Sequence, residues 1–407
     1  MPANTLRICS ITPVLPHAGI QHAGGNYVWR LHLALTEALG AHVTYLVPPY
    51  PSNDRALEDP RHAAEFSLVG RIDSHLQTLT YRAFGALKRI DPDTAYLPAA
   101  LDIWLNRRVR RTVAEADVLD FQWTAWTRLV TLRVLNKDAK TVVTFHDVTS
   151  QSFSRRHDAA QSKKEKVRWR VRHHIARIFE HRVVAVADAV VVFSEKDRKL
   201  LDPALTKNHI VVVPPPLASG NEPLQSPPSA SVVLFLAYFA RAENQQGLRW
   251  FVDRVWPVVR QSAPATTLRV AGAGMPADLM QHLQNTDGVQ VVGFVERLDD
   301  AYDSVSLTVV PLLSGAGVKF KTVEPIVRGL PVVSTTVGAE GIGTHDWFAG
   351  VADTPREFAR YVIEALRDPD SAFEHAKITR GKALQVFGQQ AFLDSLRQVY
   401  LSPKRLD

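Results

Sequence analysis

Short apolar runs alternate along the chain with segments whose apolar residues recur every three or four positions. This alternation is typical of α/β domains, in which helices cover a parallel sheet. In the first half it predicts strands at residues 6–12, 42–47, 118–122, 141–145, 189–193 and 210–213, and helices at residues 27–39 and from about residue 194. In the second half it predicts strands at residues 232–236, 267–271, 289–292, 307–311 and 332–335, and helices at residues 246–262, 322–328 and 389–400. Residues 53–100 mix helical and turn signals and give no assignment.

A stretch rich in Pro, Ser, Gly and Asn separates the two halves and has no apolar periodicity, which is typical of a linker. The chain has 407 residues, more than the roughly 250–300 at which a single hydrophobic core stops growing. We therefore predict two α/β domains, at residues 1–215 and 232–385, joined by a linker at 216–231. Two such domains would form a cleft, and ligands of open parallel sheets bind at the carboxyl ends of the strands.

A glycine-rich loop followed by two lysines and a glutamate stands out in the second half. Gly315 and Gly317 allow the backbone to approach a ligand closely, and a helix that begins nearby offers unpaired N–H groups to phosphate oxygens. Lys319 and Lys321 add positive charge at alternate positions, so that a strand-like backbone would turn only one of them inward. Glu324 can accept hydrogen bonds from hydroxyl groups. The segment predicts a sugar-nucleotide site; the alternative is an ordinary loop, helix and strand with solvated charges.

The chain is basic, with a formal net charge of +7. Residues 153–183 contain ten Lys or Arg and three acidic residues, with apolar residues between them. A helix of this composition could face anionic lipid headgroups through Lys163, Lys164, Lys166 and Arg168. A solvated basic helix is the alternative, and nucleic-acid binding is less favoured because no nucleic-acid motif accompanies the charge.

The single cysteine, Cys9, excludes an intramolecular disulfide and a cysteine-based zinc site. The first residues lack the apolar core of a signal peptide, and the longest apolar run, residues 183–193, is short and contains Asp188. We expect a cytoplasmic protein that does not span a membrane, with peripheral binding to the inner face of the cytoplasmic membrane as a further option.

Several longer segments occur in the order found in one enzyme family. In the second half these are FVDRVWPVVRQSAP, LRVAGAG, VQVVGFVERLDDAYDSVSLTVVPL and GAGVKFKTVEPIVRGLPVVSTTVGAEG; in the first half they are CSITPVLPHAGIQHAGGNYVWRLHLAL, VLDFQW and TVVTFHD. The sequence resembles the family 4 glycosyltransferases of the GT-B architecture, in the bacterial branch with a GAGVKFKTVE-type donor loop. The resemblance implies two Rossmann-like, doubly wound parallel-sheet domains facing across a cleft, with a C-terminal helix in residues 386–407 that returns to the first domain.

The resemblance also assigns roles at the donor site. Glu324 matches the second glutamate of the family's paired-glutamate motif, which binds the ribose hydroxyls, whereas the first glutamate falls on Ala316. The residue that makes the family's usual contacts to the donor sugar is therefore absent from this sequence. Gly317 matches a glycine whose neighbourhood offers backbone N–H groups. The family's pyrophosphate-binding arginine and lysine fall on Tyr238 and Asn244, which leaves three basic candidates for that role: Arg241, Lys319 and Lys321.

In the amino-terminal half, Gly24 and Gly25 resemble the family's glycine loop near the donor phosphates and the acceptor, although such a pair is often only structural. His146 follows a predicted strand and matches the histidine that contacts the reacting sugar. Asp147 would orient that imidazole or cap a helix. Neither His146 nor Asp147 supplies the carboxylate pair of a retaining glycosidase.

Together these features predict a retaining, metal-independent glycosyltransferase of the hexosyltransferase type. It would transfer a sugar from a nucleotide diphosphate sugar to a saccharide or lipid-linked acceptor, on the face that the phosphate leaves, in bacterial polysaccharide or glycolipid synthesis. No cofactor is expected, because no Asp-x-Asp motif suited to a metal between phosphates is present and the basic loop offers positive charge instead. The alternatives are a sugar-nucleotide epimerase, a phosphorylase, or a sugar-nucleotide-binding protein without catalysis.

Overall fold

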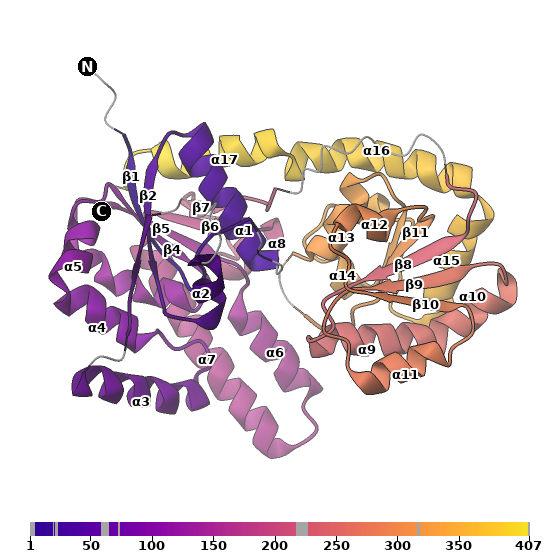
Figure 1. The fold of residues 1–407 in the computed structure, drawn as a ribbon, viewed down its shortest axis with the longest axis horizontal. Coiled ribbons are helices and arrows are strands. Elements are labelled where there is room, and N and C mark those ends of the chain that lie inside the picture. Colours follow the sequence, from indigo (N-terminus) through magenta and orange to yellow (C-terminus); the bar gives the residue numbers. More distant parts are fainter. Residues whose placement is uncertain are drawn as a thin grey trace. The chain divides into compact units, whose positions relative to one another are not determined.

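The computed structural model describes residues 5–18, 20, 23–57, 65–71, 74–216, 227–315 and 318–405. The chain divides into two compact units (Figure 1). Unit 1 comprises residues 1–216 and 390–407, and unit 2 comprises residues 217–389. Most of the predicted linker, residues 217–226, lies outside the described residues.

Unit 1 is built on a seven-stranded parallel sheet with the strand order β3-β2-β1-β4-β5-β6-β7. Its strands are β1 (Arg7–Ile11), β2 (His42–Val47), β3 (Glu65–Leu68), β4 (Val118–Gln122), β5 (Lys140–Phe145), β6 (Ala189–Val192) and β7 (Ile210–Val212). The first three strands run outward from β1, and the chain then crosses back to place β4 on the other side of β1. The direction of winding therefore reverses between β1 and β4, and ligands bind at such a switch point in open α/β sheets.

The helices of unit 1 fall on both sides of this sheet in the chain order expected for crossover connections. They are α1 (Ala23–Leu33) with the π-helical turn Ala34–Ala38, α2 (Pro51–Leu57), α3 (His75–Ile90), α4 (Leu97–Leu105), α5 (Arg107–Ala114), the 3-10 helix Trp126–Leu135, α6 (Thr149–Ala159), α7 (Lys163–Val186) and α8 (Glu195–Leu201). The hydroxyl of Ser194 caps α8 by accepting from the backbone N–H of Asp197.

The last helix, α17 (Gln389–Leu401), packs on the sheet of unit 1. The ammonium of Lys140 donates to the carbonyl oxygens of Val399 at 2.6 Å and Ser402 at 2.8 Å, where the helix has no further intrahelical donors. The hydroxyl of Tyr400 donates to Asp120 in the middle of β4 at 3.0 Å. A charged group and a buried carboxylate thus fix the helix end against β4 and β5.

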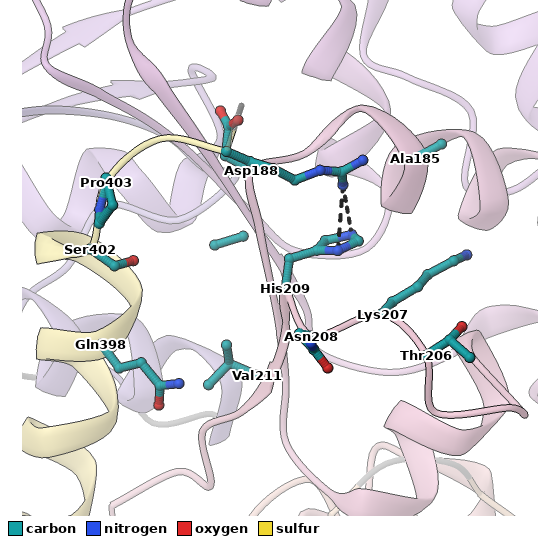
Figure 2. A pocket seen from close by; sticks show the side chains of 12 residues that line it. Ala185, Asp188, Thr206, Lys207, Asn208, His209, Val211, Gln398, Ser402 and Pro403 are labelled. Atoms are coloured by element: carbon teal, nitrogen blue, oxygen red, sulfur yellow. Dashed lines mark hydrogen bonds between the residues drawn. The ribbon is translucent and has the colours of Figure 1, made fainter. Parts of the chain in front are cut away.

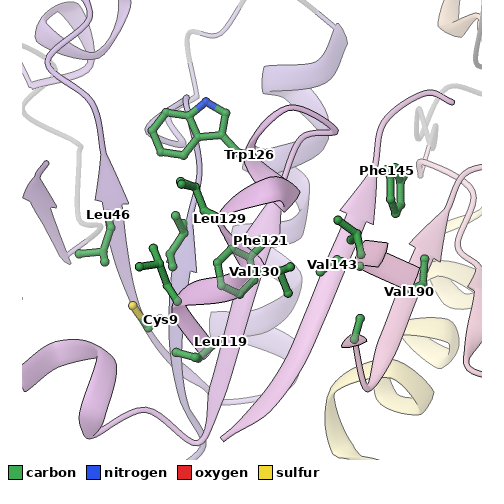
Figure 3. Packing of buried hydrophobic residues seen from close by; sticks show 14 of the residues in the cluster. Cys9, Leu46, Leu119, Phe121, Trp126, Leu129, Val130, Val143, Phe145 and Val190 are labelled. Atoms are coloured by element: carbon green, nitrogen blue, oxygen red, sulfur yellow. The ribbon is translucent and has the colours of Figure 1, made fainter. Parts of the chain in front are cut away.

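The central strands of unit 1 are buried on both faces because helices cover both sides of the sheet. One face carries hydrogen-bonded polar side chains such as Asp120 and Gln122, and the other packs in a mainly apolar core. Figure 3 shows Cys9, Leu119, Phe121, Val143 and Val190 within this core, and each is almost completely buried. Burial raises the pKa of the Cys9 thiol to about 12, so the only cysteine is held as an unreactive thiol.

Unit 2 is built on a six-stranded parallel sheet with the order β10-β9-β8-β11-β12-β13. Its strands are β8 (Val232–Leu236), β9 (Thr267–Ala271), β10 (Val289–Gly293), β11 (Leu307–Val310), β12 (Val332–Ser334) and β13 (Gly350–Val351). The winding reverses between β8 and β11, which are neighbours in the sheet. Unit 2 therefore has its own switch point, at the carboxyl ends of these two strands.

The helices of unit 2 complete a second α/β layer arrangement. They are α9 (Ala242–Trp250), the π-helical turn Phe251–Val255, α10 (Trp256–Ser262), α11 (Ala277–Gln284), α12 (Leu298–Tyr302), α13 (Phe320–Val327), α14 (Thr336–Ala339), the 3-10 turn His345–Trp347, α15 (Pro355–Arg367) and α16 (Pro369–Phe387). The single helix predicted at residues 246–262 is interrupted by the π-helical turn just before Pro257, which has no N–H to continue the ladder.

The predicted strands agree with the observed ones to within one or two residues at each end, and the fold class is confirmed. The unassigned region at residues 53–100 contains α3, β3 and parts of α2 and α4. One prediction about the donor loop is wrong. Helix α13 begins at Phe320 rather than at residue 322. Lys319 therefore occupies the N-cap position and Lys321 lies in the first turn, so the two do not alternate as in a strand.

Candidate functional site

The carboxyl ends of β8 and β11 bring the predicted donor residues of unit 2 together. Arg241 and Asn244 follow β8, and Lys319, Lys321 and Glu324 follow β11. Because β8 and β11 are hydrogen-bonded neighbours at the switch point, residues separated by more than seventy positions in the sequence meet there. The fold therefore accounts for the position of this cluster.

Lys321 joins the two loops directly. Its ammonium donates to the side-chain oxygen of Asn244, and the amide nitrogen of Asn244 donates in turn to the carbonyl oxygen of Tyr238 at 2.6 Å. Burial lowers the pKa of Lys321 to about 7; Glu243 opposes this shift, and the positive charges of Arg241 and Lys319 add to it. An anion that binds beside Lys321 would raise the pKa of the ammonium, so that the side chain becomes fully protonated.

Lys319 is the N-cap residue of α13, and its side chain is only 7% exposed. Its ammonium donates to a carboxylate oxygen of Glu340 at 3.3 Å. Glu340 follows α14, so the ion pair connects the beginning of α13 with the loop after β12. This partner was not predicted, since nothing in the spacing of the two residues indicates a contact.

Glu324 lies on α13 and is also buried. One of its carboxylate oxygens accepts from the guanidinium of Arg328 at 2.9 Å, and Arg328 also donates to Asp299 at 2.8 Å. The guanidinium lies 4.6 Å from the ring centroid of Tyr302. Arg328 was missed in the sequence, although its i,i+4 spacing from Glu324 is a signal for such a pair.

The remaining donor residues differ in how the structure places them. The side chain of Arg241 is 65% exposed and forms a 3.8 Å ion pair with Glu243. Gly317 and Ala316 lie outside the described residues. Gly315 has a φ of 140°, which a residue with a Cβ rarely adopts, so its backbone conformation accounts for glycine at this position.

In unit 1, His146 immediately follows β5, and its imidazole is surrounded by aromatic side chains. Its ring stacks on Trp123 with a centroid distance of 4.2 Å and an interplanar angle of 20°. Tyr27 meets it edge-on at 5.3 Å, and Phe193 lies at 5.1 Å. Trp123 follows β4 with a φ of 80°, an uncommon conformation for a bulky residue. Three flanking rings therefore fix the plane of the imidazole.

Gly24 and Gly25 form the first turn of α1, after β1. A Cβ atom on Gly24 would lie 2.6 Å from the indole of Trp123 and 3.4 Å from the imidazole of His146. Only glycine allows the indole to lie where it stacks on His146. This role could not be predicted from the sequence, because the contact joins residues that follow three different strands.

Asp147 interacts with Thr124 rather than with the end of a helix. The hydroxyl of Thr124 lies 2.8 Å from the carbonyl oxygen and 3.0 Å from a carboxylate oxygen of Asp147. Burial, followed by the negative charge of Asp93, raises the pKa of Asp147 to about 6. The N-cap of α6 is Val148, so the prediction that Asp147 caps a helix is wrong.

The described part of the chain contains no cluster of three or more His, Cys, Asp or Glu residues that could hold a metal ion. Among the same residues, no helix is both long enough and apolar enough to cross a membrane. The four basic residues predicted to face a membrane, Lys163, Lys164, Lys166 and Arg168, are exposed in the first turns of α7.

A pocket of about 730 Å³ opens at the amino ends of β6 and β7 in unit 1 (Figure 2). His209 and Asp188 line it, and the guanidinium of Arg405 donates to the imidazole of His209 at 3.4 Å. Burial, and then the charges of Arg405 and Lys207, lower the pKa of His209. In a parallel sheet the amino ends lie at the edge opposite to the carboxyl ends, so this pocket is separate from His146.

The two Rossmann-like units define a GT-B fold. Residues 230–368 match the family model of the glycosyl transferases group 1, which places a domain of this type in the second half of the chain.

One protein sequence and two solved structures are described here for their similarity to this chain. An uncharacterized 44.6 kDa protein in the cps region of Klebsiella pneumoniae is 32% identical over 140 residues, which are 32% of this chain and span 36% of that protein. The structure is similar to a sucrose-phosphate synthase from Thermosynechococcus elongatus (TM-score 0.65, 17% identity, 97% of this chain and 98% of that one). It is also similar to HepE of Anabaena in complex with UDP-glucose (TM-score 0.65, 14% identity, 98% of this chain and 100% of that one).

Proposed function

We propose that this protein is a retaining glycosyltransferase that moves a sugar from a nucleotide diphosphate sugar to an acceptor hydroxyl. The main support is the contact between Lys321 and Asn244, which places an ammonium group at the switch point of the unit 2 sheet. A switch point is where open α/β sheets bind nucleotides. The match of residues 230–368 to the glycosyl transferases group 1 model supports the same activity.

In this proposal the cations act on the leaving group. The diphosphate gains negative charge as the bond to the sugar breaks, and Lys321 and Lys319 would stabilise that charge together with the first N–H groups of α13. No metal is needed for this step if the lysines supply the charge. Glu324 would bind the ribose hydroxyls with the carboxylate oxygen that does not accept from Arg328.

The residues of unit 1 would act on the transferred sugar. The stacked ring of Trp123 holds His146 in one orientation, so that an imidazole nitrogen can contact a sugar hydroxyl without a large loss of conformational freedom. Asp147 would act as a positioning residue, since its contacts with Thr124 fix the end of β5 beside the end of β4. The acceptor would attack on the face that the phosphate leaves, and a phosphate oxygen would take its proton.

The substrates are also part of the proposal. A uridine diphosphate sugar is the first donor to test, because the similar HepE structure contains UDP-glucose. The acceptor would be a saccharide or a lipid-linked saccharide, and the relative encoded in a cps region of Klebsiella pneumoniae supports a role in polysaccharide synthesis.

Product analysis with donor and acceptor together, and with donor alone, tests the proposal. A transferase gives a glycosylated acceptor with the anomeric configuration of the donor. Conversion of the sugar nucleotide without acceptor would indicate an epimerase, and a need for inorganic phosphate or free nucleotide would indicate a phosphorylase.

Two variants test the roles proposed for Glu324 and His146. Glu324→Ala and His146→Ala are each expected to lower transfer by at least about a hundredfold while the unfolding curve stays cooperative. Lys382→Met, which changes an exposed lysine of unit 2, is the matched control and should retain full activity. Unchanged transfer in both site variants would refute the assignment, and nucleotide binding without any turnover would support a non-catalytic protein.

A further inference from the structure

Helix α3 in unit 1 turns its apolar face toward solvent. Leu76, Leu79, Leu87 and Ile90 are between 44% and 60% exposed, and their spacing places them on one stripe of the helix. In an ordinary surface helix this stripe packs on the core and the polar side faces water. Among the side chains of α3, only Gln77 is fully buried.

A face of α3 adjacent to this stripe attaches the helix to unit 1. The amide of Gln77 donates to Asp102 of α4 at 2.8 Å, and the ring of Phe84 meets Tyr96 edge-on at 5.1 Å. At the carboxyl end, the guanidinium of Arg172 donates to the carbonyl oxygen of Ile90 at 3.0 Å. These contacts fix the rotation of the helix, so the outward apolar stripe is built into the fold.

The charge around this stripe is positive. Helix α3 contains Arg82, Lys88 and Arg89 and no acidic residue. Through Arg172 its end adjoins α7. There the ring centroid of Trp169 lies 4.9–5.2 Å from the guanidinium groups of Arg168 and Arg172 on α7 and of Arg156 on α6. An apolar stripe flanked by Lys and Arg is the pattern of helices that lie in the interface of an anionic bilayer.

We propose that α3 binds the surface of a membrane that contains anionic lipids, with its apolar stripe among the acyl chains and the basic residues of α3 and α7 at the headgroups. A second copy of the chain is a poorer occupant, because two such faces would bring like charges together. The inference concerns binding alone and does not depend on transfer activity.

Vesicle flotation with the full chain measures the binding. We expect the wild type to float with phosphatidylcholine vesicles that contain phosphatidylglycerol, and not with phosphatidylcholine alone. Leu79→Gln with Leu87→Gln should lower the partition coefficient by roughly tenfold or more, because two large apolar side chains no longer enter the acyl region. The control is Ile378→Gln, an isoleucine of unit 2 that is 64% exposed and should have no effect.

Charge reversal tests the contribution of the basic residues of α7 to membrane binding. Replacing Lys163, Lys164, Lys166 and Arg168 by Glu should weaken flotation and remove most of its salt dependence. A control on unit 2 reverses two exposed arginines of α15, Arg356→Glu with Arg367→Glu, and should float like the wild type.

A labelled cysteine reports insertion directly. Because Cys9 is buried and its thiol remains protonated, a polarity-sensitive dye should react selectively with Leu79→Cys or with the control Ile378→Cys. Anionic vesicles should shift the emission of the first label to the blue and leave the second unchanged. The proposal is overturned if both labels behave alike, if flotation is independent of lipid charge, or if the α3 variants instead dissociate a dimer seen by light scattering.

Discussion

Binding of the donor should depend on pH through Lys321. Burial sets the pKa of this lysine at about 7 in the free protein. A diphosphate beside the ammonium would raise that pKa toward the ordinary value for lysine, since an opposite charge favours the charged form. Above pH 7 the protein must therefore take up a proton when the donor binds, and below pH 7 it already carries that proton.

The size of the effect follows from this linkage. Each pH unit above the free-state pKa costs about 1.4 kcal/mol of binding free energy, so Kd should rise by up to about tenfold per unit and by about a hundredfold from pH 7 to pH 9. A sugar nucleotide such as UDP-glucose suits the assay, because its diphosphate does not titrate in this range. Calorimetry at pH 8 in buffers of different ionisation enthalpy should count close to one proton taken up.

Two variants complete this test. Lys321→Met should weaken binding at pH 6 and abolish both the pH dependence and the proton uptake, whereas Lys382→Met should behave like the wild type. A Kd that stays constant from pH 6 to pH 9, without proton uptake at pH 8, would refute the assignment of Lys321 to the diphosphate.

Further predictions concern unit 1. Gly24→Ala should displace the indole of Trp123 and lower transfer by about 10–100-fold with the fold intact, as kcat and tryptophan fluorescence would show. Gly85→Ala, whose Cβ meets nothing within 4 Å, should instead stabilise α3 by roughly 0.5–1 kcal/mol in urea unfolding and leave kcat unchanged. Burial raises the pKa of Asp120 from 3.8 to about 6, so the folded state holds this proton more tightly and loses up to about 3 kcal/mol of stability as pH rises from 4 to 6. Asp120→Asn should remove that loss, and unchanged pH dependence of its urea unfolding would refute the account.

Sequence patterns predicted the strands well because the central strands are buried on both faces and so appear as short, mainly apolar runs between polar segments. The same reasoning failed at residues 53–100. Strand β3 is short and lies at the sheet edge, and α3 exposes its apolar stripe, so its periodicity does not report a buried face.

The site was predicted only in part for a similar reason. His146 and Lys321 could be placed because each follows a recognisable strand in the order of the chain. The stacking of Trp123 on His146 and the ion pair of Lys319 with Glu340 depend on which strand ends are neighbours in the folded sheet. A Trp directly after β4, beside a His directly after β5, is the one local signal that could have indicated the stacked pair.

The most direct test of the central claim is a thermal-shift measurement with UDP, GDP, ADP and their sugars. If unit 2 holds a nucleotide sugar at the switch point between β8 and β11, one of these nucleotides or its sugar should raise Tm. A ligand at 100 times its Kd adds about 2.7 kcal/mol of stability. The shift should be lost in Glu324→Ala and retained in Lys382→Met. If no nucleotide or sugar nucleotide changes Tm, or if Glu324→Ala responds like the wild type, the donor site proposed for this protein is contradicted.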